Sequence, residues 1–320
     1  MYEKILVTGG TGLIGQAVGS IQSQYPESEF IFWGSRDCDL TKEEESLECV
    51  RAIKPDAIIH LAAIVLGIGT RTMYPVTILR KSLAMNFNIL EAARLSDVKK
   101  VVMTLSSGMY PNKAPLPYRE EYIHDGAPDG HNYGYIHSKR FVEPMVKAYR
   151  KEFGLHVIGL VPNWLFGEND NYSEDAGVLP ALIRRFCDNR NTDDEIVVWG
   201  DGSPLREYTH CEDVARSYLW CLENYDSEQI LNIGTIEENS VKDMAFMIAD
   251  FLGIDKRRIV FDTSKPKGAL KKSTDNSRFV DLSNFTYMPF KAGLERTLKW
   301  YLDTLASDPS LIRTRSKQSV

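Results

Sequence analysis

The stretch KILVTGGTGLIGQAVGSIQSQ at residues 4–24 decides the fold of this chain. Its apolar residues 5–7 lead into a glycine-rich turn, and a helical pattern runs from residue 16 to residue 24. A strand, a glycine turn and a helix in this order predict a dinucleotide-binding unit. Gly9 would allow the tight turn, Gly12 the approach of a pyrophosphate to the backbone, and Gly15 close packing of helix and strand. The same turn adds three candidate cofactor contacts, which are Thr11, Leu13 and Ile14.

Strand-like and helix-like segments alternate through the first half of the chain. Apolar runs lie at residues 30–33, 57–61, 101–105 and 157–161, with helical patterns at 42–53, 77–95 and 137–153. This alternation predicts a parallel sheet covered on both faces. We expect an α/β fold with a Rossmann-type doubly wound parallel sheet in residues 1–165 and a smaller C-terminal α/β substrate lobe in residues 166–305. Segments from about residues 196–235 are expected to return to the first domain, and residues 306–320 to be disordered.

Composition excludes several classes of protein. The 320 residues include 38 Lys and Arg against 44 Asp and Glu, a net charge of −6, which argues against a nucleic-acid partner. The longest apolar run, at residues 61–69, is shorter than the ~20 residues that span a bilayer, and the N-terminus reaches a strand too early for a signal peptide. Five widely spaced cysteines and six unclustered histidines indicate no disulfide framework and no metal site. We expect a cytoplasmic protein that binds neither nucleic acid nor membrane.

The end of the second predicted strand bears on the choice of cofactor. An acidic side chain there would bind the ribose 2′-hydroxyl of NAD(H), but the sequence reads Gly34-Ser35-Arg36. A guanidinium group can hold a 2′-phosphate through paired, charge-assisted hydrogen bonds, so Arg36 favours NADP(H). The alternative is that Arg36 is an exposed charge and that Asp37 or Asp39 binds the ribose.

A tyrosine and a lysine four residues apart form the candidate chemical site. Tyr135 and Lys139 fall in a predicted helix, where residues i and i+4 share a face. A phenol with a pKa near ~10 exchanges protons poorly at neutral pH unless a cation favours its ionised form, which Lys139 can supply. Ser106, at the end of a predicted strand, would hydrogen-bond the carbonyl oxygen of a substrate, and Ser107 could share this role. Tyr133 has a histidine four residues on, so Tyr135 is the better candidate.

The glycine turn and the Ser, Tyr and Lys residues together resemble the short-chain dehydrogenase/reductase superfamily, in particular its extended branch. The resemblance implies that Asp39 and Leu40 lie near the adenine and that Lys139 also holds the nicotinamide ribose. It implies a segment that passes beneath the ribose and pyrophosphate, formed by Leu61, Ala62 and Ala63. A homodimer built on the helices at 77–95 and 137–153 is expected from the superfamily.

Five further segments resemble the GDP-L-fucose synthases, namely residues 106–111, 178–186, 197–200, 206–207 and 261–266. This likeness runs from about residue 4 to about residue 303 and implies a GDP-sugar substrate. It places Arg185, Arg206 and Lys272 near the diphosphate and Trp199 near the nucleotide. Planar guanidinium groups suit phosphate oxygens, and an indole can stack on a base. The other substrate contacts that it implies are Ser107, Gly108, Asn163, Val178 and Leu182.

Departures from this family concern proton transfer and the sugar pocket. GDP-L-fucose synthases carry a cysteine after the two serines and a histidine before the Val-(Ile/Leu)-Pro segment, and these exchange protons at C3 and C5 of the sugar. Here the two positions are Gly108 and Gly177, which have no titratable side chain. The family's Pro-Thr-Asn segment reads Pro-Asn-Trp at residues 162–164, in a register that could shift by one residue. The sequence thus predicts an NADPH-dependent C4 reductase of a GDP-4-keto-6-deoxy sugar, hexose or heptose, without C3/C5 epimerase activity.

Two alternatives stay open. A bifunctional GDP-L-fucose synthase could use His131 or His137 for epimerisation, although His137 lies two residues past Tyr135 and should point off the catalytic face. A non-catalytic nucleotide-sugar binding protein is the more distant alternative, and the intact Ser, Tyr and Lys residues count against it.

Overall fold

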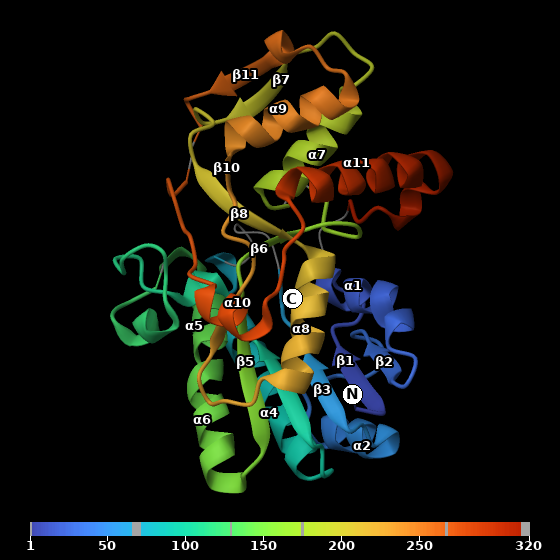
Figure 1. Cartoon of the computed structure of the whole chain (residues 1–320), viewed down its shortest axis with the longest axis vertical. Coiled ribbons are helices and arrows are strands. Elements are labelled where there is room, and N and C mark those ends of the chain that lie inside the picture. Colours follow the sequence, from blue (N-terminus) through green and yellow to red (C-terminus); the bar gives the residue numbers. More distant parts are fainter. Residues whose placement is uncertain (1, 66–71, 129, 174–175, 266–267, 315–320) are drawn as a thin grey trace.

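The computed structural model describes residues 2–65, 72–128, 130–173, 176–265 and 268–314. Its centre is a parallel sheet in the strand order β2-β1-β3-β4-β5-β9 (Figure 1). The chain runs from β1 outward to β2 and then returns to β3 on the other side of β1. Sheets of this kind bind ligands where the order reverses, which is here the end of β1. The strands are β1 (Lys4–Thr8), β2 (Glu29–Trp33), β3 (Ala57–His60), β4 (Lys100–Thr104), β5 (His156–Pro162) and β9 (Leu231–Ile233).

Helices cover both faces of this sheet. On one face α1 and α8 pack on strand residues such as Ile5 and Val7, and on the other α2, α4 and α6 pack on residues such as Leu6. Successive side chains of a strand point to opposite faces, so an unbroken apolar run is buried on both sides. The predicted Rossmann-type doubly wound fold is confirmed. The helices are α1 (Leu13–Ile21), α2 (Glu43–Ile53), α4 (Pro75–Arg94), α6 (Val142–Phe153) and α8 (Cys211–Asn224).

A second apolar core lies among α7, α9 and α11 at the other end of the molecule (Figure 1). In this lobe β7 pairs with β11, and between the lobes β8 lies between β10 and β6. The return to the first domain is made by α8 and β9, whereas β7 stays in the second lobe. The sequence patterns do not predict β6, β8, β10 or β11, because such short strands carry little periodic signal. The elements are β6 (Trp164–Phe166), β7 (Ile196–Trp199), β8 (Leu205–His210), β10 (Glu238–Ser240), β11 (Ile259–Asp262), α7 (Val178–Asp188), α9 (Val241–Leu252), α10 (Ser277–Ser283) and α11 (Phe290–Ser307).

The helix predicted at residues 137–153 is in fact two helices, α5 (Tyr133–Arg140) and α6. Phe141 separates them, and Pro144 stands in the first turn of α6. Proline has no N–H, and its ring clashes with the carbonyl four residues earlier, so a continuous helix cannot pass through this position. The break lies two residues after Lys139, so the candidate Tyr and Lys both belong to α5.

The chain end is ordered where the sequence predicts a disordered tail at residues 306–320. A 3₁₀ turn follows α11 at Pro309–Leu311, and Ile312 is 4% exposed within the second core. The carbonyl of Arg313 accepts the N–H of Tyr172 at 2.8 Å. These long-range contacts, which local periodicity does not reveal, order the chain as far as residue 314. Residues 315–320 lie outside the described part.

Candidate active site

The glycine turn lies where the strand order reverses. Gly9 has a φ of 71°, and a Cβ there would come within 2.7 Å of the backbone nitrogen of Ala62. A Cβ on Gly15 would come within 2.5 Å of the Cα of Gly10. The turn therefore packs against the chain that leaves β3. Because no side chain caps the first turn of α1, its N–H groups remain available to a pyrophosphate.

Two carboxylates that compete with Arg36 for the ribose are engaged in local turns. Asp37 accepts the N–H of Gly34 at 2.7 Å. Asp39 accepts the hydroxyl of Thr41 at 2.7 Å, and this hydrogen bond lowers the pKa of Asp39. Arg36 is exposed and makes no hydrogen bond or ion pair with any residue that the structure describes. The arrangement leaves Arg36 as the group available to a 2′-phosphate.

The other predicted cofactor contacts differ in exposure. Leu40 is 6% exposed and belongs to the core of the first domain, so its side chain does not reach the site. Thr11 is exposed at the tip of the glycine turn. The half-buried members of the set are Gly12, Leu13, Ile14, Leu61, Ala62 and Ala63.

A buried polar chain that the sequence motifs do not reveal supports the floor of this site. Oγ1 of Thr8 lies 2.8 Å from Nδ1 of His60, and Nε2 of His60 lies 3.2 Å from Oδ1 of Asn86. An amide oxygen can only accept, so the ring carries its proton on Nε2 and accepts at Nδ1. Burial, and then the charge of Lys139, lower the pKa of His60 to about 3. His60 is thus a neutral structural group at neutral pH.

The predicted chemical residues gather at the end of β4 and on α5. The Oγ of Ser106 accepts the N–H of Gly108 at 3.4 Å and so caps a 3₁₀ turn. Nζ of Lys139 donates to the carbonyl oxygen of Thr104 at 2.8 Å. A Cβ on Gly108 would lie 3.7 Å from the side chain of Ile136, so α5 packs directly on the turn that carries Ser106. One strand end therefore fixes both Ser106 and Lys139.

Lys139 is a buried cation. Its side chain is 4% exposed, and burial lowers its pKa to about 8. It has no carboxylate partner among the residues described. A buried ammonium group of this kind stabilises negative charge that develops on a neighbouring group.

Tyr135 and Tyr133 occupy different surroundings, although both lie in α5. Tyr135 is partly buried against the first core. It also lies near Tyr218, whose pKa is raised by burial and in smaller part by the charge of Tyr135. Tyr133 is 55% exposed, and its ring centre lies 4.2 Å from that of His137. These surroundings favour Tyr135 as the chemical group.

The predicted substrate contacts other than Asn163 and Arg206 divide by exposure. Trp199 is 57% exposed and Val178 is 40% exposed. Leu182 is 4% exposed within the second core, so it supports α7 and is not a surface contact. Partly buried members of the set are Ser107, Gly108, Arg185 and Lys272.

Asn163 is occupied within the chain. It is 7% exposed, its amide donates to the carbonyl of Thr235 at 2.8 Å, and its Oδ1 accepts the hydroxyl of Thr209 at 2.6 Å. This side chain joins the end of β5 to β8 and to the residues after β9. The next residue, Trp164, is 38% exposed and reaches the surface.

Arg206 of β8 is a second buried cation. It is 8% exposed, and burial lowers its pKa. Its Nη1 donates to the carbonyls of Leu205 and Ala269 at 2.7 and 2.9 Å. No carboxylate pairs with it within the described residues, and its Cζ lies 5.7 Å from the ring centre of Trp164. A buried guanidinium group with these partners can receive an anion.

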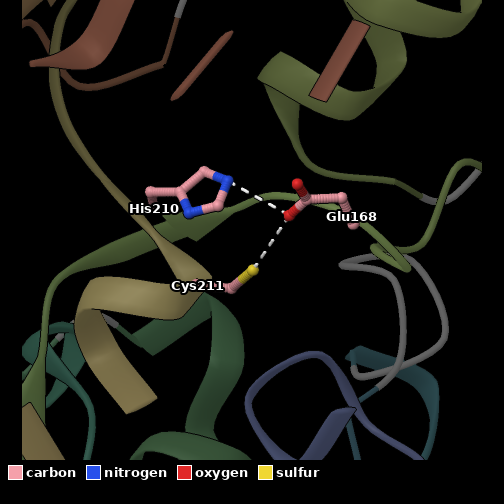
Figure 2. A group of neighbouring side chains, drawn as sticks. All are labelled: Glu168, His210 and Cys211. Carbon is pink, nitrogen blue, oxygen red and sulfur yellow. Dashed lines mark hydrogen bonds and ion pairs between the residues drawn. The ribbon is translucent and has the colours of Figure 1, made fainter. Parts of the chain in front are cut away.

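Figure 2 shows a separate cluster of Glu168, His210 and Cys211, whose ligand atoms lie within 4.8 Å of one another. Nδ1 of His210 accepts the N–H of Glu212, which places the proton on Nε2, 3.1 Å from Glu168. Burial acts to raise the pKa of Glu168, but His210 and then Arg296 lower it to about 2. A protonated Nε2 and a carboxylate shared with an arginine do not fit a metal ion. The cluster ties the chain after β6 to α8 and α11.

The sequence from residue 5 to residue 234 matches the NAD dependent epimerase/dehydratase family. The chain belongs to this family. Within it, the GDP-L-fucose synthase of Dictyostelium discoideum is 32% identical over 305 residues, which cover 93% of this chain and 95% of that protein. The NADP-bound GDP-L-fucose synthetase of Naegleria fowleri is 32% identical with a TM-score of 0.91, covering 98% of this chain and 95% of its own. The GDP-mannoheptose C4 reductase of Campylobacter jejuni, with NADP bound, shares the fold at 24% identity and a TM-score of 0.84, covering 94% and 98%.

These members of the epimerase/dehydratase family confirm the resemblance to extended short-chain dehydrogenases and to GDP-L-fucose synthases. The family's glycine turn and its end-of-strand site are the parts that this chain shows most completely. None of the helices in the described residues is long and apolar enough to cross a membrane.

Proposed function

We propose that this family member uses NADPH to reduce the C4 ketone of a GDP-4-keto-6-deoxy sugar, hexose or heptose, without epimerising C3 or C5. The observation that carries the reduction is the buried ammonium group of Lys139, held by Thr104 one helical turn from Tyr135. A preorganised cation in a buried site stabilises negative charge that develops on a phenol or a carbonyl oxygen.

The chain's own residues divide the work of the reduction. Bound NADPH supplies the hydride. Tyr135 donates the proton to the C4 oxygen, and Lys139 favours the phenolate that this leaves and also holds the nicotinamide ribose. Ser106 donates a hydrogen bond to the same oxygen and polarises the carbonyl. The oxygen of this hydroxyl accepts from Gly108, and its hydrogen is donated to no residue that the structure describes.

Two arginines support the choice of cofactor and substrate. Arg36 is available at the ribose end, which suits the 2′-phosphate of NADPH, and the similar Naegleria fowleri protein is bound to NADP. Arg206 suits the diphosphate of a GDP-sugar, and two proteins similar to this chain are named GDP-L-fucose synthase and GDP-L-fucose synthetase. Trp199, at 57% exposure, can stack on the guanine base.

Gly108 and Gly177 support reduction without epimerisation. Gly177 precedes α7 with φ −63° and ψ 170°, a conformation open to any residue. A Cβ at Gly177 would meet nothing closer than 3.9 Å, and one at Gly108 would meet Ser106 and Ile136 at 3.6 and 3.7 Å. The backbone requires glycine at neither position. What the two glycines remove is the thiol and the imidazole that GDP-L-fucose synthases place there.

The test is reduction of GDP-4-keto-6-deoxymannose by NADPH in deuterated water, followed by NMR of the product. We expect NADPH to be oxidised and no deuterium to enter at C3 or C5. Deuterium at either carbon would contradict reduction without epimerisation. Failure to oxidise NADPH with this substrate and with its heptose counterpart would contradict the reductase itself.

A bifunctional GDP-L-fucose synthase is the second candidate, because relatives at 32% identity carry that name. Its epimerisation would need other proton carriers. The ring of His137 packs against the exposed Tyr133 at an interplanar angle of 40°, and the side chain of His131 lies outside what the structure describes. A non-catalytic GDP-sugar binding protein would oxidise no NADPH in the same assay.

The assembly that we propose is a homodimer built on α4 and α6. Phe87, Phe141 and Phe153 are between 40% and 45% exposed, and the rings of Phe87 and Phe141 lie 6.2 Å apart. Exposed aromatic groups along adjacent helices form a surface that a second copy can cover. We place the enzyme in the cytoplasm, where its five free cysteines stay reduced.

A further inference from the structure

Trp164 lies at the junction between the two lobes. It is the first residue of β6, the edge strand of the small sheet β10-β8-β6, and its side chain is 38% exposed. β6 and β8 lie between the six-stranded sheet and the lobe that holds α7 and α9 (Figure 1). An indole exposed at an edge between two lobes is positioned to contact what binds between them.

Two contacts fix the position of this ring. Trp164 lies with its ring centre 5.7 Å from the Cζ of Arg206 and 6.1 Å from the ring of Tyr208. The hydroxyl of Tyr208 accepts the N–H of Leu179 in the first turn of α7 at 3.3 Å. The indole therefore lies beside the buried guanidinium group and beside the ring of Tyr208, which contacts the first turn of α7.

The hydrogen-bond donors of Arg206 indicate what kind of ligand would bind beside Trp164. Its Nη1 is used by two main-chain carbonyls, while its Nε and Nη2 have no hydrogen-bond partner among the described residues. The side chain is 8% exposed and lacks a carboxylate, so these donors suit an anion. On the proposed function, this anion is the diphosphate of the GDP-sugar.

The sheet register brings the chain at Trp164 and the chain at Ser106 to the same edge of the six-stranded sheet. Trp164 comes four residues after Leu160 of β5, which pairs with Thr104 of β4, and Ser106 comes two residues after Thr104. Trp199, the candidate for the base, lies in the separate sheet of β7 and β11. Of the two groups bonded to the diphosphate, the sugar is therefore the one next to Trp164.

We propose that Trp164 determines sugar specificity by forming the apolar wall against which the sugar ring of the GDP-sugar lies. One part of the indole covers Arg206, and its exposed part contacts the sugar, which is bonded directly to the phosphate held by that arginine. An aromatic face suits C–H groups, and it suits the methyl group of a 6-deoxy sugar better than a hydroxymethyl group. This inference rests on the proposed function.

The test compares binding of GDP and of GDP-6-deoxymannose to the NADP⁺-loaded enzyme by calorimetry. In Trp164→Ala we expect the preference for the sugar nucleotide over GDP to fall about tenfold, while the Kd for GDP changes less than about threefold. Trp164→Phe keeps an aromatic face and should retain most of the preference. Phe251→Ala is the matched control, since Phe251 is 40% exposed and belongs to α9 and not to the small sheet that contains Trp164.

Different outcomes separate this inference from the proposed function. An unchanged preference in Trp164→Ala would overturn the proposed contact between the indole and the sugar, because the ring would then contribute nothing to specificity. Equal weakening of the binding of both ligands would overturn it as well, because the ring would then act only through Arg206. A wild-type enzyme that binds neither ligand would overturn the proposed substrate class, and the wall with it. Unaltered binding of NADPH and an unaltered melting temperature in both Trp164 variants show that the fold is intact.

Discussion

Replacing Lys139 with methionine should remove catalysis and at the same time change how stability depends on pH. In the folded chain, burial lowers the pKa of Lys139 to about 8, against an ordinary value of 10.5. Between these two values the unfolded chain binds more protons than the folded one, so stability rises with pH. Below pH 8 both states are protonated, and the full cost of burying the charge is present.

The cost follows from the two pKa values. The difference in proton binding destabilises the wild-type fold by about 3 kcal/mol at pH 7 and by about 1 kcal/mol at pH 10. Lys139→Met removes this cost but also removes the hydrogen bond to Thr104, a charged bond worth about 1.5–3 kcal/mol. At pH 7 the variant should therefore be as stable as the wild type or more stable. Its advantage should shrink by about 2 kcal/mol between pH 7 and pH 10.

Urea unfolding of the cofactor-free enzyme at a series of pH values measures this difference directly. Lys299→Met, in an exposed pair with Asp303 on α11, is the control, and it should run parallel to the wild type. The free energies of Lys139→Met and wild type should converge or cross as the pH rises. If the free energies of unfolding of these two proteins changed in parallel from pH 7 to pH 10, the conclusion that burial lowers the pKa of Lys139 would be refuted. In the wild type, kcat/KM should fall as the pH rises through about 8, because Lys139 loses the proton that supports the phenolate.

Four further outcomes test other parts of the site. Tyr135→Phe should lower kcat by about 10²–10⁴-fold with the Kd for NADPH unchanged, since only the proton donor is lost; undiminished turnover would contradict its role. Arg36→Ala should raise the Kd for NADPH by about 10–100-fold in fluorescence titration and leave that for NADH nearly unchanged. Combining Gly108→Cys with Gly177→His should introduce deuterium at C3 or C5 in deuterated water, and persistent absence of label would show that more than this pair is missing. Phe141→Asp should raise the dissociation constant of the dimer by about tenfold or more in sedimentation experiments, whereas an unchanged mass would exclude the junction of α5 and α6 from the interface.

The features that could be predicted from the sequence depend on residues close together in the chain. Gly9 and Gly15 are needed because a Cβ would collide with neighbouring backbone, and that requirement appears as a spacing of glycines after an apolar run. Tyr135 and Lys139 are one helical turn apart whatever the rest of the molecule does. For the same reason the order of strands and helices in the first domain could be read in advance.

The features that could not be predicted depend on partners far along the chain. Asn163 has the residue type of a substrate ligand, but Thr209 and Thr235 occupy its amide. Leu182 is indistinguishable by pattern from an exposed member of α7, yet it lies in the second core. Arg206 is held by the carbonyl of Ala269, which no local signal connects to β8.

The two ends of the site also differ in how freely they can change. At the chemical end, Lys139 and Ser106 are held by backbone atoms of β4 and its following turn, so a change there disturbs the sheet as well as the reaction. On the proposed function, the sugar also meets Gly177 and Trp164. A Cβ at Gly177 would come no closer than 3.9 Å to another atom, and Trp164 stands in the edge strand of a small sheet. Substitutions at Gly177 and Trp164 are expected to change the proposed sugar site without moving Lys139. On the proposed function, hydride transfer to C4 can therefore persist when the group at position 177 is lost, because Lys139 and residue 177 are supported by different parts of the fold.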